Sequence, residues 1–328
     1  RSSAASDVYK RQMPKKALEE RLEDMTPCIA CLQGCVANMY AGNPICCLTN
    51  PFLGHEAEPI AKTENPKKVM VIGGGVAGLC AAFIAKEKGH EVTLYEAGDV
   101  LGGNMRLAAY PPGKGDITNM IRSYIHRCQK DGVKIVMNCE VTPELIKEEK
   151  PDSVIIATGS KTLILPIEGI DNPAIIHGSD LLDGKRPAGK KVLVVGGGMV
   201  GCETAAFLGE QEHDVTVIEF RDTVGADVIH EHRVYLMKDF EDYGIKEITG
   251  AKVCKFYEDG VEYETADGVR HETRGYDSVI LSMGFRNYNP LEEKIKDLVP
   301  ETHVIGDAIR ARRALDATKE AYEVASRI

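Results

Sequence analysis

The sequence lacks the features that mark membrane proteins and nucleic-acid-binding proteins. Its longest apolar runs, such as residues 154–157, have the length of a strand, far below the roughly 20 residues that a membrane-spanning helix requires. It has no basic stripe, and 40 Lys and Arg against 50 Asp and Glu give a net charge of −10. The first twelve residues contain no apolar stretch typical of a signal peptide. We therefore expect no membrane span, no nucleic-acid partner and a cytoplasmic location.

Enough apolar residues are present for ordinary globular domains. With 328 residues and 43% hydrophobic content, the chain is long enough for about two domains. The opening string RSSAASDVYKRQ is polar, has no helix cap and resembles a translated sequencing-adapter remnant. Residues 1–12 are therefore interpreted as a disordered artefact, and Met13 need not be the natural start. A short charged helix is predicted over residues 15–23.

A pattern of strand, glycine-rich turn, helix and strand occurs twice. In the first copy, an apolar run at 68–72 predicts a buried strand, a helix extends over about 76–88, and a second strand covers 91–96. The second copy follows about 123 residues later, with strands predicted at 191–195 and 215–219. Each copy is a βαβ unit of about 30 residues. The chain is therefore predicted to bind two dinucleotides.

The first copy carries the G-x-G-x-x-G fingerprint in Gly73, Gly75 and Gly78. The first glycine permits a tight turn, the second lets the backbone approach a pyrophosphate, and the third lets the helix pack on the strand. The N-terminus of the helix then offers free N–H groups to the phosphates. Glu96 ends the second strand, where its carboxylate can accept hydrogen bonds from a ribose.

The second copy has Gly196, Gly198 and Gly201 in the equivalent places, followed by Glu219. A carboxylate at that position suits the free 2′-hydroxyl of NADH and repels the 2′-phosphate of NADPH. Arg221 is two residues further on, so NADPH stays a possible second donor. A tightly held flavin with a diffusing nicotinamide explains two such units. Since hydride transfer between stacked rings needs no side-chain acid, no catalytic residue is predicted.

Five of the ten cysteines fall within one short stretch, which indicates metal ligation and not a disulfide framework. Four of them follow the pattern Cys28-x2-Cys31-x3-Cys35-x11-Cys47, and Cys46 is interpreted as a neighbouring non-ligand. The other five are expected to be small core residues: Cys80, Cys128, Cys139, Cys202 and Cys254. A [4Fe–4S] cluster, a structural zinc site and a redox-active dithiol compete as interpretations, and spacing alone does not separate iron from zinc. The flavin context favours the cluster, because a cluster passes the single electrons that a flavin can release.

Residues 26–35, 47–51 and 54–56 resemble the iron–sulfur segment of the bacterial 2,4-dienoyl-CoA reductase, 2-enoate reductase and trimethylamine dehydrogenase group. These enzymes carry an Old Yellow Enzyme-type barrel. The resemblance covers nearly everything after about residue 15. It continues through both glycine turns and through residues 101–104, 111–114, 157–159 and 305–307.

This resemblance implies an electron path from NAD(P)H through FAD and [4Fe–4S] to the FMN of the barrel, which reduces an activated carbon–carbon double bond. A barrel requires roughly 250 residues, and about 27 precede Cys28. We therefore expect the electron-input module of an NAD(P)H-dependent flavoprotein oxidoreductase, here without its FMN barrel and without the enoate or enoyl-CoA site. The resemblance also implies an anaerobic setting, and a homo-oligomer is possible.

Carried over position by position, the resemblance makes Cys28, Cys31, Cys35 and Cys47 the cluster ligands. It places the following residues around FAD, besides the glycine turn: Ala77, Glu96, Gly103, Asn104, Lys114, Val141, Gly306 and Asp307. Two positions depart from the group's pattern. Thr26 stands where arginine is usual, and Asn104 stands where glutamine is frequent.

The predicted fold class is α/β, with two Rossmann-like units in which the NAD(P)H-binding domain is inserted into the FAD-binding domain. The expected boundaries are 13–62 for the iron–sulfur segment, 63–185 plus 286–328 for the FAD domain, and 186–285 for the NAD(P)H domain. Two other functions compete with the oxidoreductase module. One is an electron donor like the small subunit of glutamate synthase, although its cysteine spacings differ. The other is a non-catalytic scaffold that binds ADP.

Overall fold

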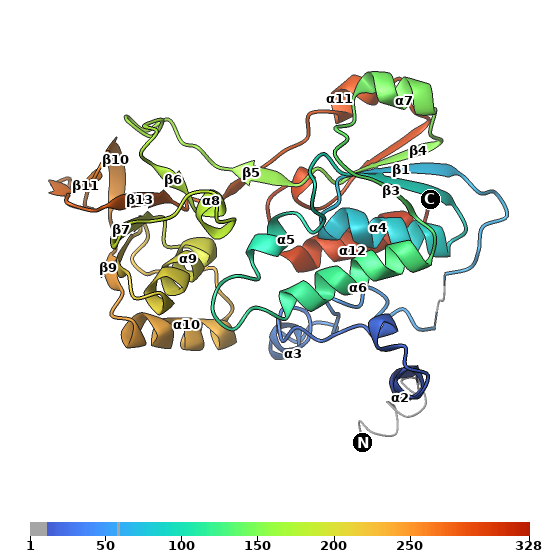
Figure 1. Cartoon of the computed structure of the whole chain (residues 1–328), viewed down its shortest axis with the longest axis horizontal. Coiled ribbons are helices and arrows are strands. Elements are labelled where there is room, and N and C mark those ends of the chain that lie inside the picture. The colour runs from blue at the N-terminus through green and yellow to red at the C-terminus, as the bar shows by residue number, and fades with distance from the viewer. Residues whose placement is uncertain (1–11, 58–59) are drawn as a thin grey trace. The chain divides into compact units, whose positions relative to one another are not determined.

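The computed structural model describes residues 12–57 and 60–328. These residues form two compact units, which are described separately (Figure 1). The first unit contains the chain up to residue 106, residues 116–159 and residues 287–328, and the second contains residues 107–115 and 160–286. The second unit therefore interrupts the first in sequence. The expected disorder of residues 1–12 concerns a segment of which residues 1–11 lie outside the described residues.

The first unit is built on a five-stranded parallel sheet with the order β15-β4-β1-β2-β3. The predicted strand 68–72 is confirmed as β1, and the predicted second strand is confirmed over all but its last residue. Both faces of β1 are buried, as is typical of a parallel sheet covered by helices. The strands are β1 (Lys68–Ile72), β2 (Glu91–Tyr95), β3 (Lys134–Val136), β4 (Ser153–Ile156) and β15 (Glu301–Val304).

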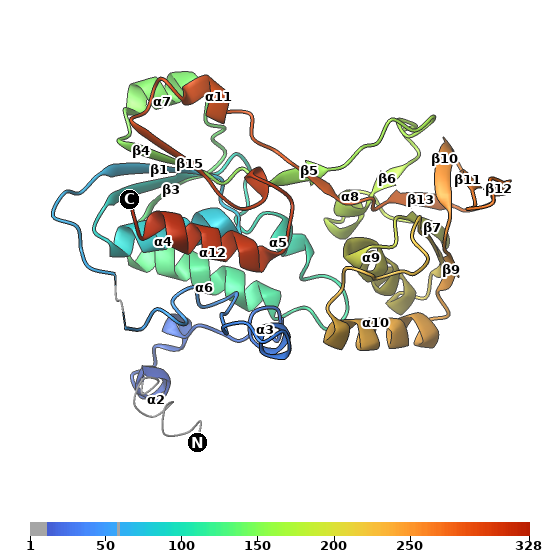
Figure 2. The same ribbon diagram turned by 180° about the vertical axis from the view of Figure 1, so that it is seen from behind.

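Three long helices pack together on one side of this sheet. The helices are α4 (Val76–Glu87), α6 (Ile117–Lys130) and α12 (Ala314–Ala325), which lie together in Figures 1 and 2, and α4 packs on both of the others. The predicted helix after the first glycine turn is confirmed in α4, which ends just before Gly89, a residue in the left-handed conformation with φ +102°. The other side of the sheet packs on α7 (Pro143–Glu149) and α11 (Glu292–Ile295). Two short helices also belong to this unit: α5 (Asn104–Leu107), which follows two glycines, and η2 (Gly306–Ala308), which begins at a glycine.

The second unit has a parallel sheet of its own, with the order β6-β13-β7-β8-β9. Its strands are β6 (Ile176–His177), β7 (Lys191–Val195), β8 (Asp214–Ile218), β9 (Lys246–Ile248) and β13 (Ser278–Leu281). One face packs on α8 (Gly178–Leu182), α9 (Met199–Glu210) and α10 (His230–Asp242), and the other on an antiparallel sheet of β10 (Lys252–Tyr257), β11 (Gly260–Glu264) and β12 (Arg270–Thr273). The remaining strands, β5 (Ser160–Thr162) and β14 (Phe285–Asn287), pair with each other. The α/β class with two Rossmann-like units is therefore confirmed.

The cysteine segment packs on the first unit. Leu48 is fully buried, and its carbonyl accepts a hydrogen bond from the Tyr124 hydroxyl of α6 at 2.9 Å. Phe52 makes an edge contact with Tyr322 of α12, and the Arg127 guanidinium lies over its ring at 4.6 Å. These contacts fix the segment against α6 and α12. The segment also contains α3 (Val36–Tyr40).

Two local boundaries differ from the sequence predictions. The helix predicted over 15–23 is replaced by α2 (Gln12–Leu18) and the 3-10 turn η1 (Leu22–Asp24), separated by Glu20, whose φ of +56° is incompatible with a helix. Residues 160–185, expected in the FAD domain, lie in the second unit because β6 pairs with β13 at the edge of its sheet. Among the described residues, no helix combines the length and the apolar character needed to span a bilayer.

Candidate functional site

The first glycine turn connects β1 to α4 and leaves room only for glycine. Gly73 has φ +109°, and a Cβ on it would lie 2.3 Å from the Ala157 carbonyl oxygen. A Cβ on Gly78 would lie 1.9 Å from the carbonyl oxygen of Gly73, so this glycine lets α4 approach the strand. Around Gly75, in contrast, a Cβ would meet nothing within 4 Å. The backbone there is open to an approaching pyrophosphate.

Glu96 follows β2 and holds the turn through both carboxylate oxygens. One oxygen accepts from the Gly74 N–H at 2.7 Å, and the other accepts from the Gly98 N–H at 2.7 Å. The side chain is only half-buried. Because each carboxylate oxygen has two lone pairs, Glu96 can still accept hydrogen bonds from a ribose.

Several other residues predicted around FAD lie close to this turn. A Cβ on Gly306 would lie 3.0 Å from Ala77 Cβ, and one on Gly103 would lie 3.2 Å from Gly75 Cα. The glycines of η2 and of the loop before α5 are thus brought to the N-terminus of α4. Two further predicted residues follow these glycines, Asn104 at the start of α5 and Asp307 in η2. Val141 lies elsewhere, in the apolar core beneath α7 and α11.

The second glycine turn connects β7 to α9 with the same geometry. Gly196 has φ +104°, and a Cβ on Gly201 would lie 1.8 Å from its carbonyl oxygen. Glu219, which follows β8 and is buried, accepts from the Gly197 N–H at 2.5 Å and from the Arg221 N–H at 2.9 Å. The two turns therefore share one hydrogen-bond scheme. In each, the terminal acid accepts from the second of three consecutive glycines and from the residue two positions after the acid itself. This agreement extends the sequence repeat to the level of individual atoms.

Glu203 is a candidate functional residue that the sequence analysis did not nominate. It lies one turn into α9, is buried, and forms an ion pair with the ammonium group of Lys114. Lys114, expected near FAD, belongs to the second unit together with Glu203. A carboxylate in the mostly apolar stretch 199–208 was the available signal, since buried carboxylates are rare unless paired.

The four predicted cluster ligands share one neighbourhood. Burial raises the pKa of the Cys31 thiol, and the nearby thiols of Cys47, Cys35 and Cys28 raise this pKa further. Cys46 has different partners, since its sulfur lies 3.4 Å from the Asn38 amide nitrogen and 3.7 Å from the Gly34 carbonyl.

The donor set suits iron or zinc in its chemistry, because thiolates are ligands that both zinc and iron–sulfur clusters prefer. Within the described parts of the chain, however, no group of three or more Cys, His, Asp or Glu side chains is close enough to hold a metal ion. The cluster assignment therefore stays a prediction.

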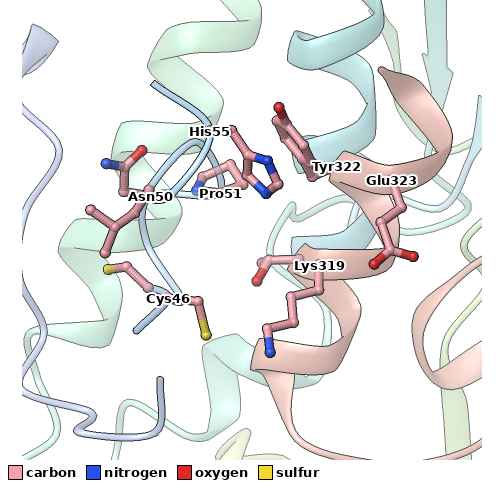
Figure 3. A pocket seen from close by; sticks show the side chains of 10 residues that line it. Cys46, Asn50, Pro51, His55, Lys319, Tyr322 and Glu323 are labelled. Carbon is pink, nitrogen blue, oxygen red and sulfur yellow. The ribbon is translucent and has the colours of Figure 1, made fainter. Parts of the chain in front are cut away.

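A pocket of about 170 Å³ lies beside Cys46 and Cys47, between the cysteine segment and α12. Figure 3 shows His55 next to Tyr322, and the two rings stack with centroids 4.3 Å apart. Lys319 of α12 lines the same pocket and also a neighbouring one of about 430 Å³. The cationic side chain of Lys319 and the cysteine segment therefore line the same pocket.

The cysteines outside this segment were predicted to be small core residues. Cys80, Cys128 and Cys202 are fully buried, and burial raises their pKa values, to about 12 for Cys128 and Cys202. Such thiols are unreactive at neutral pH, so the prediction is confirmed for these three. Cys139 and Cys254 are only half-buried.

Residues 67–305 match the pyridine nucleotide-disulphide oxidoreductase family, which covers both glycine turns, both terminal acids and both parallel sheets. The chain belongs to this family. Membership implies FAD and NAD(P)H as cofactors, in agreement with two dinucleotide-binding turns. The protein is therefore an oxidoreductase of the flavin- and pyridine-nucleotide-dependent kind.

Curated relatives support the resemblance inferred from the sequence. The chain is 32% identical to a metal reductase of Desulforamulus reducens, over 96% of this chain and 52% of the relative. It is 32% identical to a cinnamate reductase of Clostridium sporogenes, over 97% of this chain and 48% of the relative. The chain thus spans about half the length of the curated relatives it matches.

Solved structures agree with these relatives. The structure of 2-naphthoyl-CoA reductase in complex with 2-naphthoyl-CoA matches with a TM-score of 0.91 and 33% identity, over 96% of this chain and 48% of the other. A thioredoxin reductase of T. acidophilum, at 19% identity and a TM-score of 0.59, shares the fold alone. The predicted resemblance to the enoate reductase group is confirmed.

Proposed function

We propose that the chain is the electron-input module of an iron–sulfur flavoenzyme, which takes electrons from NADH and delivers them toward a site that reduces carbon–carbon double bonds. When bound, FAD would accept hydride from NADH, and a [4Fe–4S] cluster would carry the electrons onward singly. The observation that carries the proposal is the exact repetition of the glycine-turn hydrogen bonds at Glu96 and Glu219. Two turns of this kind supply binding sites for two dinucleotides.

Each turn contributes the same three functions. Its glycines let the backbone approach a pyrophosphate, the helix N-terminus attracts the phosphate charge, and the terminal acid accepts hydrogen bonds from the ribose. At the second turn, the buried Glu219 carboxylate disfavours a 2′-phosphate, so we propose NADH as the preferred donor. Cys28, Cys31, Cys35 and Cys47 would hold the cluster on the first unit.

The outer surface of the cysteine segment favours a further partner domain. Met39, Tyr40 and Ile45 are exposed by 54%, 75% and 51%. Exposed apolar side chains grouped on one segment are typical of an interaction surface. Since the relatives are about twice as long as the matched region, we propose that this surface contacts the FMN barrel that the resemblance implies.

An anaerobic purification of residues 13–328 tests the proposal. We expect about one FAD and about four irons per chain, together with bleaching of the flavin absorbance when NADH is added. Iron content of a Cys46→Ala variant should equal that of the unmodified chain, because Cys46 has partners of its own. A colourless protein that contains zinc or ADP, and whose spectrum NADH leaves unchanged, would refute the proposal in favour of a scaffold.

A further inference from the structure

The loop after β8 repeats the loop after β2 at the glycine turn. The Gly102 N–H donates to the Gly74 carbonyl at 2.9 Å, and the Gly225 N–H donates to the Gly197 carbonyl at 2.7 Å. Both donor glycines are left-handed, with φ +110° and +62°. Two residues after each of them stand Asn104 and Asp227. These two positions are therefore equivalent, and an amide in the first copy corresponds to a carboxylate in the second.

The Asp227 carboxylate lies at the N-terminus of α9. One of its oxygens accepts a hydrogen bond from the Met199 N–H at 2.8 Å. A Cβ on Gly198 would lie 3.4 Å and 3.5 Å from its two oxygens. At the equivalent Gly75 of the first turn, a Cβ would meet nothing within 4 Å. Besides the terminal acid that both turns share, a carboxylate of the chain thus lies beside Gly198 of the second turn, whereas nothing lies within 4 Å of a Cβ on Gly75 of the first.

We propose that Asp227 sets the affinity of the second turn for a nucleotide pyrophosphate by holding the N–H group that the phosphate requires. The inference rests on the proposed function, in which the second unit binds NADH. One N–H group cannot serve two anions at full strength, and two negative charges at this distance repel each other. Nucleotide binding therefore has to move the carboxylate of Asp227 away from Met199.

An amide at this position removes the charge while it keeps the size of the side chain. For Asp227→Asn we expect the dissociation constants of NADH and of ADP-ribose to fall about tenfold, the effect of about 1.4 kcal/mol. Adenosine, which has no phosphate, should bind both proteins equally. The gain should shrink as the salt concentration rises, because added ions screen the repulsion.

Two control variants separate the local contact from the overall charge. Asp222→Asn removes another carboxylate of the same loop. This carboxylate lies beside Gly250 and not beside the glycine turn, so its removal should leave the binding of NADH nearly unchanged. Asn104→Asp places the carboxylate at the first turn, and there it should weaken the retention of FAD. Asp227→Ser provides a second way to remove the charge, and circular dichroism of each variant checks its fold.

Calorimetric titration with NADH, ADP-ribose and adenosine decides between the outcomes. Tighter binding of both pyrophosphates to Asp227→Asn and Asp227→Ser, with adenosine unchanged, supports the proposal. Equal dissociation constants in the unmodified chain and in both variants overturn it while the proposed function stands. Weaker binding to the variants also overturns it, because Asp227 would then contact the nucleotide. Absence of binding in every protein, including the unmodified chain, refutes the inference and the NADH site together.

Discussion

Replacing Tyr124 by phenylalanine should loosen the cysteine segment without disturbing the dinucleotide turns. Tyr124 is buried on α6, and its hydroxyl donates at 2.9 Å to the carbonyl of Leu48, the residue after Cys47. Its ring packs edge-on against Phe83 at 5.1 Å. Phenylalanine keeps this ring contact and removes only the donor. The substitution therefore removes the hydrogen bond between α6 and the segment, together with the hydroxyl's contact with the Cys80 thiol of α4.

The cost follows from the burial of both partners. Leu48 is fully buried, so its carbonyl would lose a partner in a site that water does not readily reach. Leaving such a group unsatisfied costs about 1–3 kcal/mol. A value of about 1–2 kcal/mol raises the population of the opened segment about 5- to 30-fold. The opening should be local, because Tyr124 makes this bond to the segment and not to the sheet.

Hydrogen exchange measured by mass spectrometry provides the assay. Peptides that cover residues 44–55 should exchange faster in Tyr124→Phe, while peptides from β1 and β7 should keep their rates. Tyr95→Phe is the matched control, since Tyr95 is also a buried tyrosine of the first unit but packs in the core beneath α7 and α11. If the segment exchanges at the same rate in all three proteins, the hydrogen bond to Leu48 does not hold it in place.

Four further substitutions test the remaining features. Cys31→Ala should abolish iron binding but leave reduction of the flavin by NADH nearly intact, as an iron assay and the visible spectrum would show. Glu219→Ala should shift the preference for NADH over NADPH by about tenfold toward NADPH, measured from the two Kd values. Gly201→Ala would place a Cβ 1.8 Å from the Gly196 carbonyl and should lower stability by about 1–3 kcal/mol in a thermal melt. The pKa of Asp24 lies below the usual 3.8, chiefly because Lys130 donates a hydrogen bond to its carboxylate. The ionised carboxylate therefore stabilises the fold above about pH 4, and this stabilisation is lost as the pH falls. Asp24→Asn should flatten this part of the acid-unfolding curve.

The sequence predicted the parts of the fold that depend on local rules. A continuous apolar run, three glycines at fixed spacing and an acid after the next strand are sufficient to specify a dinucleotide-binding turn. The strands at 68–72 and 191–195 accordingly begin and end at the predicted residues. The helix predicted over 15–23 failed because nothing in its charge pattern indicates the left-handed Glu20.

The features that the sequence did not reveal depend on contacts between distant residues. Lys114 and Glu203 are 89 positions apart, and neither motif that contains them indicates the other. The two-residue strand β6 moves residues 160–185 into the second unit, and its length gives no periodic signal. In the sequence, nothing distinguishes Tyr124 from the apolar residues around it. Only the folded chain shows that its hydroxyl donates to the Leu48 carbonyl.

The difference between Asn104 and Asp227 gives the two turns different tasks within one architecture. A flavin has to stay bound through many turnovers, whereas a nicotinamide nucleotide has to leave after each one. A carboxylate that competes for the Met199 N–H weakens retention without altering the glycines or Glu219, on which recognition depends. If this account is correct, exchanging the two residues should exchange the retention of the two ligands in part: the double variant Asn104→Asp, Asp227→Asn should lose FAD faster on gel filtration and release NADH more slowly in a stopped-flow experiment. A double variant that keeps both rates of release would show that retention is decided elsewhere in each site.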